Sequence, residues 1–209
     1  MANDPTLAKS DRDYLLAARH LDTVDLERVR GFLTSNDDRT RVLARRVLAT
    51  RRVMTDDEWT SALTDSSSGA RRDALEWFAR EESDVRLLPL VRGLLADSDA
   101  LVCEAACFAL GELGDGDALD ALCDIARRHE DPRCREAALG ALGALGDPRA
   151  TETVIAALED KPSVRRRAVV ALAAFEGPEV DAALERARED RDWQVRAAVD
   201  QLDPHGLGE

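Results

Sequence analysis

Apolar residues recur along this chain at helical spacing, and the pattern itself repeats. Each stretch opens with one residue, most often apolar, that is followed by a small residue four places later and a larger apolar residue eight places later. This spacing predicts one buried face of a helix. The small residues are Ala44, Ala74, Ala106, Ala138 and Ala168, and the larger ones are Leu48, Phe78, Leu110, Leu142 and Leu172. The opening positions, called anchors below, are Thr40, Ala70, Val102, Cys134, Val164 and Val195. Their nearly constant spacing indicates a series of similar structural units, roughly six in number.

Each unit holds a second helical stretch after the one that carries the anchor. Gly114 and Gly146 are typical of helix ends, and Asp147-Pro148 and Gly177-Pro178 are typical of helix starts. The second helices are expected near residues 84–96, 117–129, 149–159 and 179–189.

A helical pair with a period of about 31 residues cannot bury its apolar face alone and has to stack on its neighbours. The pattern therefore predicts an all-α fold, a right-handed α-solenoid of about six helical hairpins in a single domain over residues 1–209. We expect an irregular capping hairpin at 1–35, divergent repeats at 36–97, regular repeats at 98–190, and a capping helix with a tail at 191–209. The polar loop Thr64–Gly69 is a candidate flexible point.

The run Ala-Leu-Gly-x-Leu-Gly-Asp, a second helix, and then Asp-x-x-Val-Arg-x-x-Ala resembles HEAT repeats of the short type named for phycobilisome lyases. The resemblance is strongest from about 98 to 199. It implies an inter-repeat ladder formed by an Arg after each anchor and an Asp five or six places ahead of such an Arg. The corresponding residues are Arg41, Arg71, Arg135, Arg165 and Arg196 with Asp65, Asp160 and Asp190, and Cys103 interrupts the arginine series.

The charge balance narrows the class of function. The chain carries 42 Asp and Glu against 29 Lys and Arg, a formal charge of −13. Such a surface repels a phosphate backbone and argues against general nucleic-acid binding. The abundance of Asp and the scarcity of Lys resemble proteins of extreme halophiles. The sequence contains no uncharged apolar run long enough to span a bilayer and no signal-like N-terminus, so we expect a cytoplasmic protein that does not enter a membrane.

Candidate chemistry along the chain is sparse. Cys103, Cys107, Cys123 and Cys134 lie in one part of the sequence, but they form no Cys-x-x-Cys pair and are expected to serve packing, with metal or redox use as the alternative. His20, His129 and His205 are widely spaced. We therefore predict no catalytic, metal-binding or cofactor-binding residues and no cofactor. The alternative is a HEAT-repeat enzyme, similar to a phycocyanobilin lyase or to the metal oxidoreductase deoxyhypusine hydroxylase.

The remaining interpretation is a non-enzymatic, monomeric scaffold that binds another protein. Concave surfaces of such arrays bind partners, and we expect the second helices to line that surface. Their exposed charged positions are the candidate partner-binding residues: Arg92, Asp120, Asp124, Arg127, Arg128, Glu152, Glu159 and Arg186.

Overall fold

The computed structural model describes residues 5–20, 23–80 and 85–202, and all regular elements among them are helical. The chain divides into two compact units, Met1–Leu90 and Val91–Glu209. The boundary is not at Thr64–Gly69, which lies inside the first unit. There the Ser67 amide donates to Asp65 Oδ1 at 2.9 Å, and the Ser67 hydroxyl donates to Asp38 Oδ2 at 2.9 Å.

The first unit consists of helical hairpins, as the pattern predicts. Its core clusters around Leu15, Val29 and Leu48, all without solvent exposure. Its elements are α1 (Pro5–Ala18), α2 (Leu26–Gly31), η1 (Phe32–Thr34), α3 (Asp38–Thr50), α4 (Asp56–Leu63), α5 (Ser68–Arg80) and η2 (Val85–Leu87). Helix α6 (Leu88–Gly93) spans the boundary between the units.

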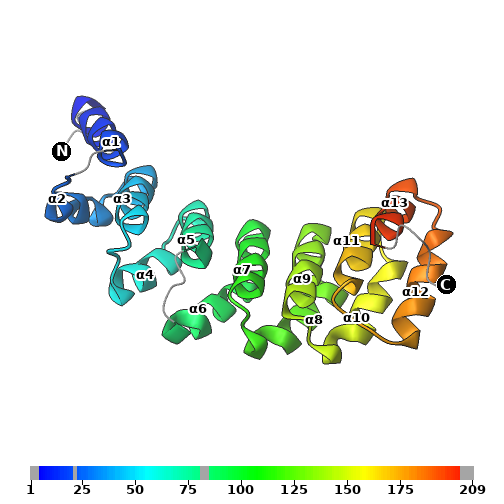
Figure 1. Cartoon of the computed structure of the whole chain (residues 1–209). Helices are drawn as coiled ribbons and strands as arrows, with labels where there is room; N and C mark the ends of the chain where they lie inside the picture. The colour runs from blue at the N-terminus through cyan, green and yellow to red at the C-terminus, as the bar shows by residue number, and fades with distance from the viewer. Residues whose placement is uncertain (1–4, 21–22, 81–84, 203–209) are drawn as a thin grey trace. The chain divides into compact units, whose positions relative to one another are not determined.

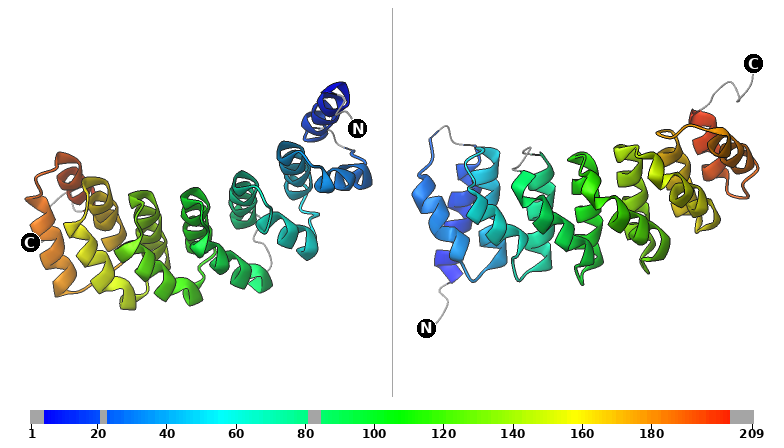
Figure 2. Two further views of the ribbon diagram at one scale, coloured as in Figure 1. Left: turned by 180° about the vertical axis from the view of Figure 1, so that it is seen from behind. Right: turned by 90° about the horizontal axis from the view of Figure 1, so that it is seen from below.

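The second unit holds the regular repeats in two layers (Figures 1 and 2). One layer contains the helices that carry the anchors, α7 (Ala100–Glu112), α9 (Pro132–Leu145), α11 (Pro162–Leu172) and α13 (Trp193–Leu202). We call these four the anchor helices. The other layer contains η3 (Leu94–Ala96), η4 (Gly116–Ala118), α8 (Leu119–Arg128), η5 (Pro148–Ala150), α10 (Thr151–Ala156), η6 (Ala157–Glu159) and α12 (Pro178–Arg188).

Helix ends follow the predicted signals. Gly114 and Gly146 have φ of +66° and +60°, the left-handed conformation in which glycine closes a helix without steric cost. Pro148 and Pro178 lie in the first turn of η5 and α12, where a proline loses no helical hydrogen bond. The predicted second helices are confirmed to within a few positions, although residue 84 and the tail 203–209 lie outside the described residues. None of the described helices is long and apolar enough to span a membrane.

The anchor helices of the second unit approach one another through glycine and alanine. A Cβ added to Gly111 on α7 would lie 2.8 Å from the Cα of Ala141 on α9. A Cβ added to Gly143 on α9 would lie 3.0 Å from the Cα of Ala171 on α11. The distance at Gly111 is too short for a real Cβ, and the distance at Gly143 is shorter than almost all real Cβ contacts, so glycine at these two positions allows the backbones to pack this closely.

Three of the predicted ladder arginines, Arg41, Arg135 and Arg165, pair with the aspartates that were expected as their partners. Arg135 donates to Asp160 through Nε and Nη2 at 2.7 Å each, and Arg165 donates to Asp190 at 2.8 and 2.7 Å. Arg41 pairs with Asp65 in the same way within the first unit. Each arginine therefore joins its own repeat to the loop of the following one, with the fork geometry that favours a carboxylate.

A second contact ties each ladder arginine to its own loop. Nη1 of Arg135, Arg165 and Arg196 donates to a backbone carbonyl five or six places earlier, at 2.6 to 2.8 Å. Burial raises the pKa of Asp65, but hydrogen bonds from Arg41, the Ser67 amide and Arg45 outweigh it and hold that pKa well below its usual range.

Helix spacing can be tested with two glycines. Gly111→Ala should destabilise the protein by about 1–3 kcal/mol, because the new methyl group collides with α9. Gly140→Ala is the matched control, since its nearest neighbour is a flexible Arg167 side chain at 3.9 Å. It should stabilise the helix by about 0.5–1 kcal/mol. Urea unfolding measures both changes, and equal stabilisation by the two variants would contradict the close packing.

The ladder predicts a dependence of stability on pH. Hydrogen bonds from Arg165 hold the pKa of Asp190 below its usual range. The pair therefore stabilises the fold fully above the unfolded pKa of about 3.9 and loses that contribution as pH falls through the folded pKa. At neutral pH, Asp190→Asn should cost about 3 kcal/mol, because it leaves a buried arginine unpaired.

The control for this substitution is Asp147→Asn. Asp147 also pairs with an arginine, but Arg149 is 70% exposed. Its loss should cost less than about 1 kcal/mol. Unfolding free energies measured between pH 7 and 3 should show the difference between wild type and Asp190→Asn shrinking toward acid pH. A difference that stays constant with pH would be inconsistent with an ionised ladder.

Candidate partner-binding surface

The eight charged residues predicted as partner-binding lie on the second helices and their extensions. Arg92 is on α6, Asp120, Asp124, Arg127 and Arg128 are on α8, Glu152 is on α10, Glu159 is on η6, and Arg186 is on α12. All are exposed except Arg92, which is held by Asp117 at 2.7 Å and Asp115 at 3.4 Å.

The structure brings only part of this set together. Glu159 and Arg186 line one surface hollow of about 370 Å³, in which the ladder residues Arg165 and Asp190 also take part. Arg128 lies 3.7 Å from Asp124 along the same helix, a spacing typical of a weak exposed pair. Asp120, Arg127 and Glu152 are exposed on the same layer.

The two layers of the second unit differ in how closely their helices pack. Helix α9 packs extensively against both α7 and α11, whereas α8, α10 and α12 contact one another only sparsely. In a curved stack the layer with the closer spacing lies on the inner side. The inner side of this unit is therefore formed by the anchor helices, and the expectation that second helices line it is wrong for this unit.

Exposed apolar side chains gather on the anchor helices. Within the described part of the second unit, all large hydrophobic residues with high exposure lie on that layer. They are Phe108 (57% exposed) on α7, Val170 (46%) on α11, and Trp193 (66%) and Leu202 (36%) on α13. A solvent-exposed tryptophan and phenylalanine on one layer are typical of a surface that binds another protein.

Two hollows on this layer share one arginine. The first, of about 390 Å³, is lined mainly by Arg166, Arg167, Val170 and Trp193 with glutamines of α13. The second, of about 210 Å³, lies between α7 and α9 and includes Phe108, Glu136 and again Arg167. We define the anchor-helix face by Phe108, Arg166, Arg167, Val170 and Trp193.

The charge on this face differs from that of the chain as a whole. Arg166 and Arg167 are both exposed, and within residues 5–20, 23–80 and 85–202 neither has a carboxylate at ion-pair distance. Their neighbour Arg165 is 4% exposed and belongs to the ladder. Two adjacent unpaired guanidinium groups beside an exposed indole can bind carboxylates and an apolar side chain together.

Sequence reasoning missed Phe108 and Trp193. The signal that could have found Phe108 is its position relative to the anchor on the helix. Phe108 and Val170 both lie six places after an anchor. The buried side of each helix carries the residues four and eight places after the anchor, so an apolar side chain at the sixth place has no partner in the core.

The four cysteines are all free and buried. Within the described residues, the group of three side chains close enough to hold a metal is Cys103, His129 and Cys134. The sequence does not reveal these three as a set, because each comes from a different element.

Comparison with known proteins identifies the repeat. The family model of HEAT repeats matches residues 56–139 and 119–203. No curated protein sequence matches the chain.

Several solved structures share the fold. The complex of CpcE and CpcF of phycocyanin lyase from Nostoc sp. PCC7120 is 24% identical, with a TM-score of 0.62 over 86% of this chain and 76% of that one. YibA of Escherichia coli is 14% identical, with a TM-score of 0.63 over 95% and 74%. An engineered protein is 18% identical, with a TM-score of 0.59 over 86% and 95%. At these identities the likeness concerns the fold.

Proposed function

Because this chain belongs to the HEAT-repeat family, whose stacked hairpins present extended binding surfaces, we propose that it is a non-enzymatic interaction module that binds a protein partner on the anchor-helix face. The observation that carries this proposal is the gathering of the exposed large hydrophobic residues of the second unit on one layer. The CpcE–CpcF structure is a complex of two chains, which supports a protein as the partner class.

The chemistry of the face specifies the kind of segment that fits it. Trp193 and Val170 offer an apolar contact, and Arg166 and Arg167 lie in the same hollow. A partner segment with carboxylates flanking an apolar or aromatic side chain would satisfy both. Burial of the exposed indole supplies affinity, and the arginines supply orientation and selectivity. Because the anchor helices are closely packed, we expect binding to need little ordering of this chain.

Lyase or oxidoreductase activity receives less support from the residues. The match to phycocyanin lyase concerns the fold, and the residues shared with the short HEAT repeat are packing and ladder residues. Within the described residues, the group able to hold a metal consists of two cysteines and a histidine. A hydroxylase of the deoxyhypusine kind would need several His-Glu pairs instead.

The partner can be identified by site-directed photo-crosslinking at Gln194, which lies beside Trp193 in the first hollow. A crosslinker at Glu152 on α10, in the other layer, is the control. A protein that is crosslinked from Gln194 and not from Glu152 is then purified for binding measurements.

Binding to that protein should depend on the anchor-helix face. Trp193→Ala, and separately Arg166→Glu with Arg167→Glu, should each raise the Kd at least about tenfold, because they remove the aromatic contact or reverse the local charge. The matched control is Arg127→Glu with Arg128→Glu, which reverses two adjacent exposed arginines on α8 and should leave the Kd unchanged. If the α8 pair weakens binding and Trp193→Ala does not, the partner binds the second helices instead.

A further inference from the structure

One rung of the ladder in the second unit has different chemistry. At the junctions α9–α11 and α11–α13 the rung is an arginine after the anchor and an aspartate in the next loop: Arg135 with Asp160 and Arg165 with Asp190. At the junction α7–α9 the position after the anchor is Cys103. The loop position six places before Arg135, which corresponds to Asp190 before Arg196, is His129.

Backbone contacts show that His129 occupies the aspartate position. Its carbonyl accepts from Arg135 Nη1 at 2.6 Å, as the Asp190 carbonyl accepts from Arg196 Nη1 at 2.7 Å. Its Nδ1 accepts from the Asp131 amide at 3.1 Å, as Asp190 Oδ1 accepts from the Asp192 amide at 2.7 Å. The imidazole therefore keeps the loop contact of the aspartate and presents its other edge to the site that an arginine would fill.

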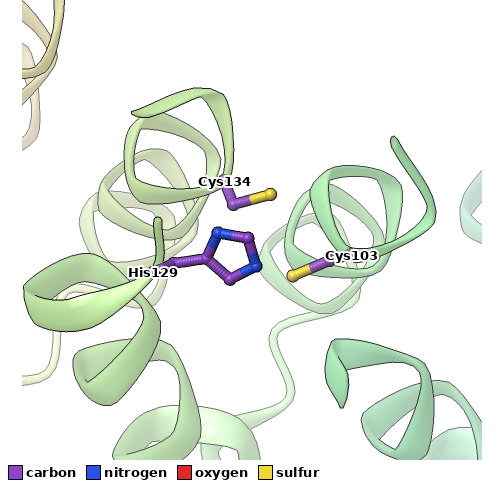
Figure 3. Close-up of side chains that lie close together, drawn as sticks. All are labelled: Cys103, His129 and Cys134. Carbon is purple, nitrogen blue, oxygen red and sulfur yellow. The ribbon is translucent and has the colours of Figure 1, made fainter. Parts of the chain in front are cut away.

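The side chains at this junction converge. One donor atom from each of Cys103, His129 and Cys134 lies within 4.8 Å of the others. Figure 3 shows the imidazole beside the two sulfur atoms, with its Nε2 edge toward Cys103. Cys103 and Cys134 have no solvent exposure, and His129 is half-buried, so the group opens to solvent on the histidine side.

The surroundings suit a cation. The Cys134 thiol donates to the Ala100 carbonyl at 3.2 Å. The carboxylates of Asp97, Glu104 and Asp131 add negative potential. Without a cation this junction lacks the ionic rung that the α9–α11 and α11–α13 junctions possess.

We propose that Cys103, His129 and Cys134 bind a zinc ion, which joins the repeats of α7 and α9 in place of the arginine–aspartate rung. Two thiolates and an imidazole are a donor set that zinc prefers. Tetrahedral zinc with bonds of about 2.0–2.3 Å places its donor atoms roughly 3.8 Å apart, so small side-chain shifts suffice. The fourth position, on the solvent side, takes a water molecule.

Zinc binding has a defined proton balance. Because Nδ1 accepts from the Asp131 amide, the neutral imidazole carries its proton on Nε2, the nitrogen that faces Cys103. Coordination by Nε2 moves that proton to Nδ1 and breaks the contact with the Asp131 amide. Both thiols are deprotonated and release two protons to solvent, so affinity rises with pH.

The experiment is a titration of the fully reduced, metal-free protein with Zn²⁺ alone, followed by calorimetry in two buffers of different ionisation enthalpy. We expect one equivalent bound, with net release of protons and a raised Tm. Cobalt substitution should produce a thiolate-to-metal charge-transfer band. Absence of stoichiometric binding, or a disulfide between Cys103 and Cys134 as the stable state of the untreated protein, would overturn the proposal.

Variants separate binding from folding. Cys103→Arg combined with His129→Asp rebuilds the ordinary rung, so this double variant should fold and lose the zinc-dependent rise in Tm. Cys134→Ala and His129→Asn should each raise the Kd for zinc at least about tenfold, since even indirect neighbours of a metal have effects of that size. Asn at 129 can still accept from the Asp131 amide and so preserves the loop.

Cys123→Ala is the matched control, because Cys123 is another buried cysteine, on α8, outside the group. It should bind zinc as the wild type does. Equal zinc affinity in the rebuilt-rung variant and the wild type would place any bound metal elsewhere and refute the proposal.

Discussion

The close approach of the anchor helices is the constraint on which the second unit depends. Gly111 against Ala141 leaves no room for a Cβ at the glycine, and Gly143 against Ala171 leaves very little. This approach brings α7, α9 and α11 into one tightly packed layer, whereas the second helices contact one another only sparsely. The difference in spacing determines the inner side of the unit and therefore which side chains a partner can meet together.

The ladder of arginine and aspartate fixes the register in which one repeat packs against the next. A buried arginine that donates to the next loop and to its own loop leaves little freedom for one repeat to slide against another. Charges at this depth are costly unless paired, so the rungs contribute more to register than to net stability. This also explains how an acidic chain tolerates buried aspartates: their carboxylates are satisfied by guanidinium groups and backbone amides.

The two proposed sites differ in their relation to this framework. The anchor-helix face takes no part in the packing of the helices, since the side chains of Phe108, Val170 and Trp193 are exposed. The Cys103, His129 and Cys134 group is part of it, because it stands where a rung belongs. A metal there would act on the joint between two repeats, on the same unit that carries the exposed aromatic residues.

The sequence by itself determined the period and the helix ends, because these follow from local rules within one repeat: helical spacing, glycine at positive φ and proline in the first turn. The ladder residues were expected from the resemblance of the recurring Asp-x-x-Val-Arg pattern to short HEAT repeats. Only the tertiary structure decided which layer is inner and which side chains meet across a junction. Helical periodicity identifies the buried side of each helix but not the spacing of two layers, so the expectation for the second helices failed. Cys103 and His129 come from α7 and the loop after α8. They converge because contact between two repeats places the position after one anchor opposite the next loop.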